Sequence, residues 1–142
     1  MDESLKILEA NGLSRTEVRK KILDLFLRSE IALSLSAIES SFEKLDRITL
    51  YRTLKTFEGK GIIHKAIDGT NRPKFAICKA PYAEGHHHDN HAHFHCTSCE
   101  KTVCLDHLPT PGFPKLDKGY QIQEMNVIFS GTCPECSAGL KI

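Results

Sequence analysis

Four cysteines form two pairs in the second half of the chain, Cys96-x-x-Cys99 and Cys133-x-x-Cys136. Two intervening residues let both thiolates of a pair reach one ion at about 2.3 Å, and two pairs complete a tetrahedron. A site closed in this way has no open coordination position. The spacing therefore predicts a structural zinc ion whose binding adds to the free energy of folding. A redox-active dithiol pair and two disulfides are the alternatives.

Histidines supply a second group of potential ligands. His91, His93 and His95 alternate along the chain, so on a strand all three project from one face, and two imidazoles at i and i+2 can share a metal ion. His64 and Cys78 precede them. Taken singly, a histidine is usually a satisfied polar group and a cysteine a small buried side chain.

The composition of the 142 residues changes near residue 70. All six cysteines lie at or beyond Cys78, and seven of the eight histidines at or beyond His86. We therefore expect two units, 1–78 and 79–142. No apolar run is long enough for a signal peptide or a membrane span, so we expect a cytoplasmic protein without a membrane partner. Disulfides are rare in the reducing cytoplasm. The net charge of +1 does not by itself indicate nucleic acid.

The first 60 residues carry helical patterns. The first helix is expected from about Glu3 to Ala10, closed by Asn11-Gly12. Capping residues predict where three more begin: Ser14 with Glu17, Ser36 with Glu39, and Asp46. The last of these helices ends at Gly59-Lys60-Gly61.

After residue 61 the sequence pattern changes from that of helices to that of extended strands. Residues 62–67, a turn at Asp68-Gly69 and a return strand over residues 74–77 predict a β-hairpin, here called the wing. Helices followed at once by such a hairpin are typical of a winged helix-turn-helix, whose last helix enters the major groove of DNA.

The last helix has two unlike faces. Leu50, Leu54 and Phe57 share the face that packs inward, and its outward face suits phosphates and base edges. An ordinary solvated helix face is the alternative. The outward residues are Thr49, Tyr51, Arg52, Lys55 and Thr56.

The second half predicts a small sheet. Residues 103–105 and the alternating stretch from Tyr120 to Phe129 are candidate strands, and three prolines between them argue against a long helix. The fold class is therefore α+β: an N-terminal winged helix-turn-helix domain followed by a small α/β dimerisation domain with a four-cysteine zinc site.

These motifs together resemble the ferric uptake regulator superfamily over nearly the whole chain. The matching segments are the Arg19 region, Ile48 to Leu54, His91 to Cys99, and Gly131 to Cys136. The resemblance implies a homodimer on a double-stranded DNA operator, a hinge between the two domains and a sensory metal ion. It also implies DNA contacts by Arg19, Thr49, Tyr51, Arg52 and Lys55.

The resemblance also bears on the sensed metal. Iron and peroxide sensors of the superfamily take a histidine near the position of Ala32 and a carboxylate at that of Ala76, and both are missing here. The zinc uptake regulators have the pattern found in this chain. It implies a second, regulatory Zn²⁺, with Fe²⁺ or Mn²⁺ as the alternatives, bound by His64, Cys78, His91 and His93.

Three further residues are candidate ligands of that site: Glu84, His95 and Cys104. Cys104 stands where relatives often have an acidic ligand, and we interpret it first as a plain buried side chain, then as a ligand or a redox-sensitive thiol. The dimerisation helix expected between Cys104 and Tyr120 looks shortened or lost.

The hypothesis is a metal-dependent repressor. Zinc that ties the wing to the dimerisation domain would fix the separation of the two recognition helices, about 34 Å for half-sites one turn apart. An iron- or peroxide-responsive regulator is one alternative, and a zinc-binding redox chaperone is another. An enzyme with a small organic substrate is not expected, because the chain has no His-x-Glu or His-Glu-x-x-His motif.

Overall fold

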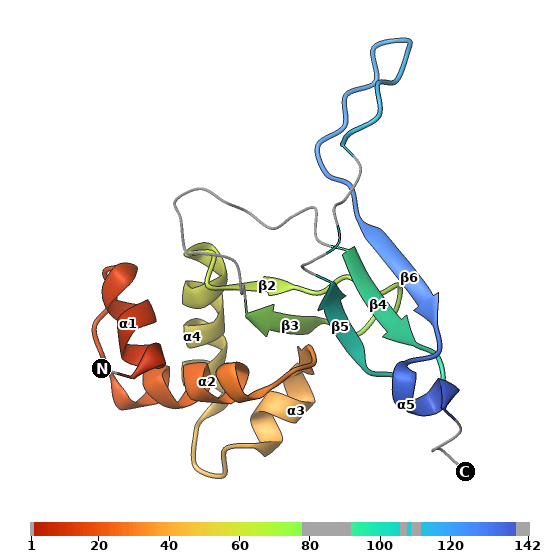
Figure 1. The fold of residues 1–142 in the computed structure, drawn as a ribbon. Helices are drawn as coiled ribbons and strands as arrows, with labels where there is room; N and C mark the ends of the chain where they lie inside the picture. Colours follow the sequence, from red (N-terminus) through yellow and green to blue (C-terminus); the bar gives the residue numbers. More distant parts are fainter. Residues whose placement is uncertain (1, 78–91, 106–107, 109–111, 139–142) are drawn as a thin grey trace.

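The computed structural model describes residues 2–77, 92–105, 108 and 112–138. The first part contains α1 (Glu3–Ala10), α2 (Glu17–Arg28), β1 (Leu33–Ser34), α3 (Leu35–Ser40), α4 (Arg47–Gly59), β2 (Ile63–Lys65) and β3 (Lys74–Ile77). The second contains β4 (Ala92–Cys96), β5 (Thr102–Leu105), β6 (Val127–Gly131) and α5 (Pro134–Ser137). The helices α1 to α4 lie at one end, the second sheet with α5 at the other, and β2 and β3 between them (Figure 1). The α+β class is confirmed, and the predicted boundary between 78 and 79 lies outside the described residues.

The wing belongs to a three-stranded antiparallel sheet of order β1-β3-β2. Its two long strands pair as predicted, with His64 opposite Ala76. The third strand, β1, was not predicted. It pairs Leu33 with Phe75 and Ser34 with Lys74, and its two residues are too few to show an alternating pattern.

Only one of the three predicted helix starts is correct. The Asp46 side chain caps α4 by accepting a hydrogen bond of 2.6 Å from the Thr49 amide. For α2 the cap is Thr16 rather than Ser14, and for α3 it is Ser34 rather than Ser36. Several hydroxyl residues lie close together before each helix, so the pattern did not decide which of them is the N-cap.

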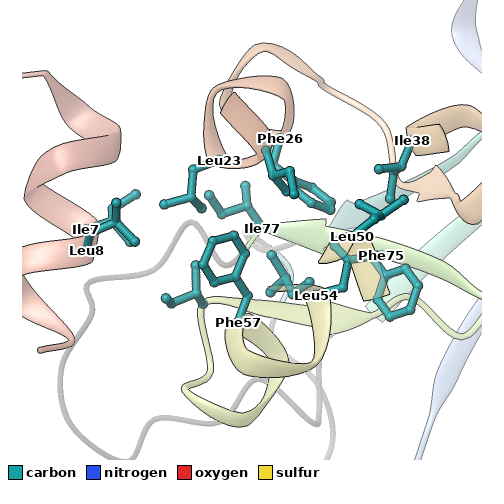
Figure 2. Close-up of a cluster of buried hydrophobic side chains, with 13 residues drawn as sticks. Ile7, Leu8, Leu23, Phe26, Ile38, Leu50, Leu54, Phe57, Phe75 and Ile77 are labelled. Carbon is teal, nitrogen blue, oxygen red and sulfur yellow. The ribbon is translucent and has the colours of Figure 1, made fainter. Parts of the chain in front are cut away.

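The apolar core lies between the four helices and the wing (Figure 2). The inward face of α4 is confirmed, because Leu50, Leu54 and Phe57 are all buried. The side chains that meet them include Ile7 and Leu8 from α1, Leu23 and Phe26 from α2, Ile38 from α3, and Phe75 and Ile77 from β3.

The second sheet has the order β5-β4-β6. β4 runs antiparallel to β5 and parallel to β6. The strand predicted from Tyr120 is present only at its end, because residues 120–126 form no strand and extend away from the body (Figure 1). Between Leu105 and Tyr120, the described residues contain no helix.

The two sheets differ in what they bury. The apolar core cluster lies wholly in the first half. Within the described residues from Ala92 onward, the buried apolar side chains are Ala92, Cys96 and Cys133. No helix in the described ranges is long and apolar enough to cross a membrane.

Phe57 tests the core of the first half. Phe57→Ala removes a side chain that is 0% exposed, and we expect the free energy of unfolding to fall by about 3–5 kcal/mol. Ile48→Ala on the same helix is the control, because Ile48 is 65% exposed, and its effect should stay within about 0.5 kcal/mol. Urea denaturation followed by circular dichroism measures both. Equal losses would contradict the assigned faces of α4.

Candidate metal centres and DNA-facing helix

The four cysteines of the two pairs converge on one point. The sulfurs of Cys96, Cys99, Cys133 and Cys136 all lie within 4.8 Å of one another. The Cys99 and Cys133 sulfurs are 3.8 Å apart, and metal–sulfur bonds of about 2.3 Å give a tetrahedron with edges of about 3.8 Å. The described cysteines form no disulfide. The donor set therefore fits a tetrahedral metal ion.

Backbone amides stabilise a thiolate in the four-cysteine cluster. The Cys96 sulfur accepts hydrogen bonds of 3.4 Å from the amides of Cys99 and Cys133. The Cys99 amide above all lowers the pKa of the Cys96 thiol to about 5. Burial and the neighbouring sulfurs raise the pKa of the Cys136 thiol to about 12. Four thiolates cannot accumulate here by themselves, and a dication would supply the missing charge.

An ion pair joins the segments that carry the two cysteine pairs. Lys101 Nζ lies 2.8 Å from Glu135 Oε1, and this contact lowers the pKa of Glu135 to about 2. Glu100 ends the turn between β4 and β5 with a φ of 69°, a value more typical of glycine. Its amide donates to the Cys96 carbonyl at 2.8 Å. The chain therefore turns sharply after Cys99 into β5.

A second cluster contains His64, His93 and Cys104. It is called the sensory cluster here, after the regulatory ion that the sequence resemblance implies. The Nε2 atoms of the two histidines are 3.5 Å apart, and the Cys104 sulfur lies 3.3 Å from His64 Nε2. Bonds of about 2.0–2.3 Å to one tetrahedral ion give edges of about 3.3–3.7 Å. His64 comes from β2, His93 from β4 and Cys104 from β5, so an ion here would join the wing to the second sheet.

The structure places the other predicted ligands elsewhere or does not describe them. Cys78, Glu84 and His91 lie outside the described residues. His95 is not part of the sensory cluster: its Nδ1 lies 3.0 Å from Thr102 Oγ1 and 3.6 Å from Asp68 Oδ2. Cys104, interpreted from the sequence first as a plain buried side chain, is half-buried within the cluster.

Most of the predicted outward face of α4 is exposed, although Thr56 is half-buried. Tyr51, Arg52 and Lys55 are exposed to solvent, and so is Ile48, which was not among the predicted outward residues. Thr49 is half-buried, and its hydroxyl donates to Asp46 at 3.2 Å. The exposed residues form a stripe at helical spacing that offers two cations, a phenol and an apolar side chain.

Glu39 holds two side chains of this helix. Its Oε2 accepts a hydrogen bond of 2.9 Å from the Tyr51 hydroxyl and lies 3.0 Å from Arg47 Nε. The contact with Glu39 raises the pKa of Tyr51. No sequence pattern indicated this contact, because Glu39 and Tyr51 belong to different helices.

Arg19 lies on the first turn of α2. Its guanidinium donates to the Ser14 carbonyl at 3.1 Å and to the Ser14 hydroxyl at 2.9 Å. In this arrangement the side chain braces the loop before α2, and its contact with DNA stays a prediction.

Comparisons with known proteins agree with this architecture. The pattern of the "Ferric uptake regulator family" matches residues 10–127. The "Ferric uptake regulation protein" of Staphylococcus epidermidis is 30% identical over an alignment of 142 positions, which covers 95% of this chain and 94% of the relative. A "Zinc Uptake Regulator Complexed With Zinc AND DNA" is similar in structure, with a TM-score of 0.67 at 18% identity over 99% of this chain and 94% of that one.

A second solved structure shows the same fold. It is the Helicobacter pylori ferric uptake regulator, described as having three functional metal binding sites, with a TM-score of 0.57 at 19% identity over 95% of this chain and 90% of that one. The family match over residues 10–127 includes α4, the wing and the sensory cluster, whereas Cys133 and Cys136 lie beyond it. Because its outward face is predicted to contact DNA, α4 is called the DNA-facing helix below. The chain belongs to the ferric uptake regulator family and is a DNA-binding regulator of metal-responsive transcription.

Proposed function

We propose that this protein is a zinc-responsive repressor. The observation that carries the proposal is the sensory cluster, in which the Cys104 sulfur lies 3.3 Å from His64 Nε2 and the two histidine nitrogens are 3.5 Å apart. The cluster joins the wing to the second sheet. Binding of a metal ion there is expected to fix how the DNA-facing helix is oriented relative to the rest of the protein.

The chemistry of the donors favours zinc. Sulfur and imidazole donors at tetrahedral spacing suit Zn²⁺, whereas Mn²⁺ prefers six-coordinate, oxygen-rich surroundings and non-haem Fe²⁺ sites commonly include a carboxylate. Cys78 directly follows β3, and His91 directly precedes β4. Either residue could complete the site. Because the S. epidermidis relative is described as a ferric uptake regulation protein, Fe²⁺ is the alternative that the experiment must include.

The protein's own residues perform the regulatory step. His64 is presented by the wing, and His93 and Cys104 by adjacent strands of the second sheet. A bound ion supplies a crosslink between these donors. The crosslink restricts rotation of the wing, so a larger fraction of molecules has the arrangement that fits two half-sites on DNA.

The four-cysteine site has a structural role in this proposal. Its four donors form a closed shell, so its Zn²⁺ contributes to folding rather than to sensing. The pairs that it joins belong to the β4–β5 turn and to the start of α5. It therefore holds the sheet that presents His93 and Cys104.

The protein is proposed to act as a homodimer. The β6 edge has no further strand of this chain beside it among the described residues. Phe129 on β6 and Phe113, Leu116 and Tyr120 before it are exposed, Tyr120 by 68%. A second copy would cover these side chains and place two DNA-facing helices on one operator.

The structural metal is tested by Cys99→Ser. We expect the variant to lose one Zn²⁺ per chain and to unfold at a lower temperature, because the second sheet has little apolar core. Cys104→Ser is the control and should retain this ion. Metal analysis after dialysis against a mild chelator, together with thermal unfolding, measures both effects. A Cys99→Ser protein with wild-type metal content would contradict the assignment.

The sensory metal is tested by DNA binding. Duplexes selected by the wild-type protein from a random pool with Zn²⁺ serve as the operator. His93→Ala and Cys104→Ser should each weaken Zn²⁺-dependent binding at least about tenfold, while the structural Zn²⁺ stays bound. Anaerobic titrations with Zn²⁺, Fe²⁺ and Mn²⁺ complete the test. If Fe²⁺ restores binding far better than Zn²⁺, the protein is an iron regulator of the same family.

The DNA-facing helix is tested by Arg52→Ala. Loss of one guanidinium contact should weaken operator binding by about 1–3 kcal/mol. Arg28→Ala removes the same charge from the exposed end of α2 and is the control, which should bind as the wild type does. Fluorescence anisotropy at fixed salt measures both. Equal losses in the two variants would show a general effect of charge rather than a contact made by α4.

A further inference from the structure

The wing carries a buried carboxylate that no metal site uses. Asp68 is 4% exposed. Its Oδ1 accepts hydrogen bonds from the amide and hydroxyl of Thr70 at 3.0 and 2.7 Å. Its Oδ2 accepts from the Thr102 hydroxyl at 2.7 Å and lies 3.0 Å from Lys74 Nζ. A buried carboxylate with this many partners stays ionised and holds them in place.

Half of this network belongs to the second sheet. Thr102 is on β5, and its hydroxyl also lies 3.0 Å from His95 Nδ1 on β4. Lys74 on β3 donates to Thr102 Oγ1 and to the Glu100 carbonyl, each at 3.1 Å. We call these four residues, Asp68, Lys74, His95 and Thr102, the carboxylate latch.

The hydrogen bonds of the carboxylate latch stabilise the ionised form of the Asp68 carboxylate. Burial by itself raises the pKa of Asp68, but the hydrogen bonds from Thr102, Thr70 and Lys74 outweigh it and hold the pKa well below its usual range. The Thr102 hydroxyl has one hydrogen, which it donates to Asp68, so it accepts from Lys74 and His95. Replacing this hydroxyl by a methyl group would remove its hydrogen bonds to Asp68, Lys74 and His95 at once.

A backbone contact lies beside the carboxylate latch. The Ala32 amide donates to the Thr102 carbonyl at 2.7 Å. Ala32 directly precedes β1, and Thr102 begins β5. The first and second sheets are therefore joined by both a side-chain network and a main-chain hydrogen bond, neither of which contains a metal ligand.

The register of β4 and β5 relates the carboxylate latch to the sensory cluster. His93 pairs with Cys104, and His95 pairs with Thr102. Residues two apart on a strand share a face and lie about 7 Å apart, so the two pairs are adjacent rungs on one face of the sheet. From the wing, His64 meets the first rung and Asp68 meets the second.

We propose that the carboxylate latch pre-assembles the sensory metal site, with Asp68 and Thr102 as positioning residues that set its affinity for the metal. The inference rests on the proposed function. The latch and the Ala32–Thr102 hydrogen bond both join the two sheets at Thr102, so the sheets can still rotate relative to each other about this region. The metal ion supplies an attachment at a second place. Because the halves already touch at the latch, metal binding does not have to bring His64 to the second sheet from a distance, and less conformational entropy is lost.

Thr102 offers a matched pair of variants. Thr102→Val keeps the shape of the side chain and removes the hydroxyl, whereas Thr102→Ser keeps the hydroxyl. Asp68→Asn removes the charge at the other end of the contact. The full-length protein with its structural Zn²⁺ is used throughout, and the probe is Zn²⁺ in competition with a chromophoric chelator of known affinity.

Two readouts separate positioning from simple loss of structure. Thr102→Val and Asp68→Asn should weaken Zn²⁺ binding at the second site about tenfold, with Thr102→Ser close to the wild type. Before the second Zn²⁺ is added, the Ala32 amide should exchange with deuterium faster in the two weakened variants. The Ala66 amide, which donates to the Lys74 carbonyl within the wing, should exchange as in the wild type. At saturating Zn²⁺, operator binding should return to within about threefold of the wild type.

Other outcomes have distinct meanings. Wild-type Zn²⁺ affinity and wild-type Ala32 exchange in Thr102→Val and Asp68→Asn would overturn the proposal. So would a failure of saturating Zn²⁺ to restore operator binding in these variants while the wild type responds, because that result indicates a damaged fold. If the wild type binds a second Zn²⁺ without any change in DNA binding, the repressor function fails, and the latch is then judged by Zn²⁺ affinity and Ala32 exchange alone.

Discussion

Convergence of the two cysteine pairs is the constraint on which the second half of the protein depends. Its described residues bury few apolar side chains, and two of these are Cys96 and Cys133. Hydrophobic burial alone is a weak source of stability for so small a sheet. A metal ion held by the four sulfurs would replace the missing core and fix the turn that leads into β5. The positions of Thr102 and Cys104 follow from that turn.

The first half is stabilised in a different way. Its four helices and the wing share one apolar core, and the buried face of α4 turns the opposite face toward solvent (Figure 2). The same core fixes the wing, because Phe75 and Ile77 on β3 are part of it. The DNA-facing helix and the wing residue His64 therefore move as one body. In the proposed mechanism, metal binding changes the orientation of this body relative to the second sheet.

That relation depends on two adjacent rungs of β4 and β5. One rung carries His93 and Cys104, which meet His64, and the other carries His95 and Thr102, which meet Asp68. In the proposed mechanism a cation stabilises the first contact by binding the sulfur and imidazole donors together. The second contact is made without one. A sensor of the proposed kind keeps its ligands close together and still responds to the supply of metal.

Spacing along the chain was enough to predict the periodic elements and the four-cysteine cluster: the inward face of α4, the wing strands and the two cysteine pairs. Spacing did not decide between neighbouring hydroxyls as helix caps, or show that β1 pairs with β3. Only the tertiary structure placed Cys104 beside His64 and His95 beside Asp68. These contacts join residues far apart in the chain, and they depend on strand register and the docking of two sheets, which local patterns do not encode.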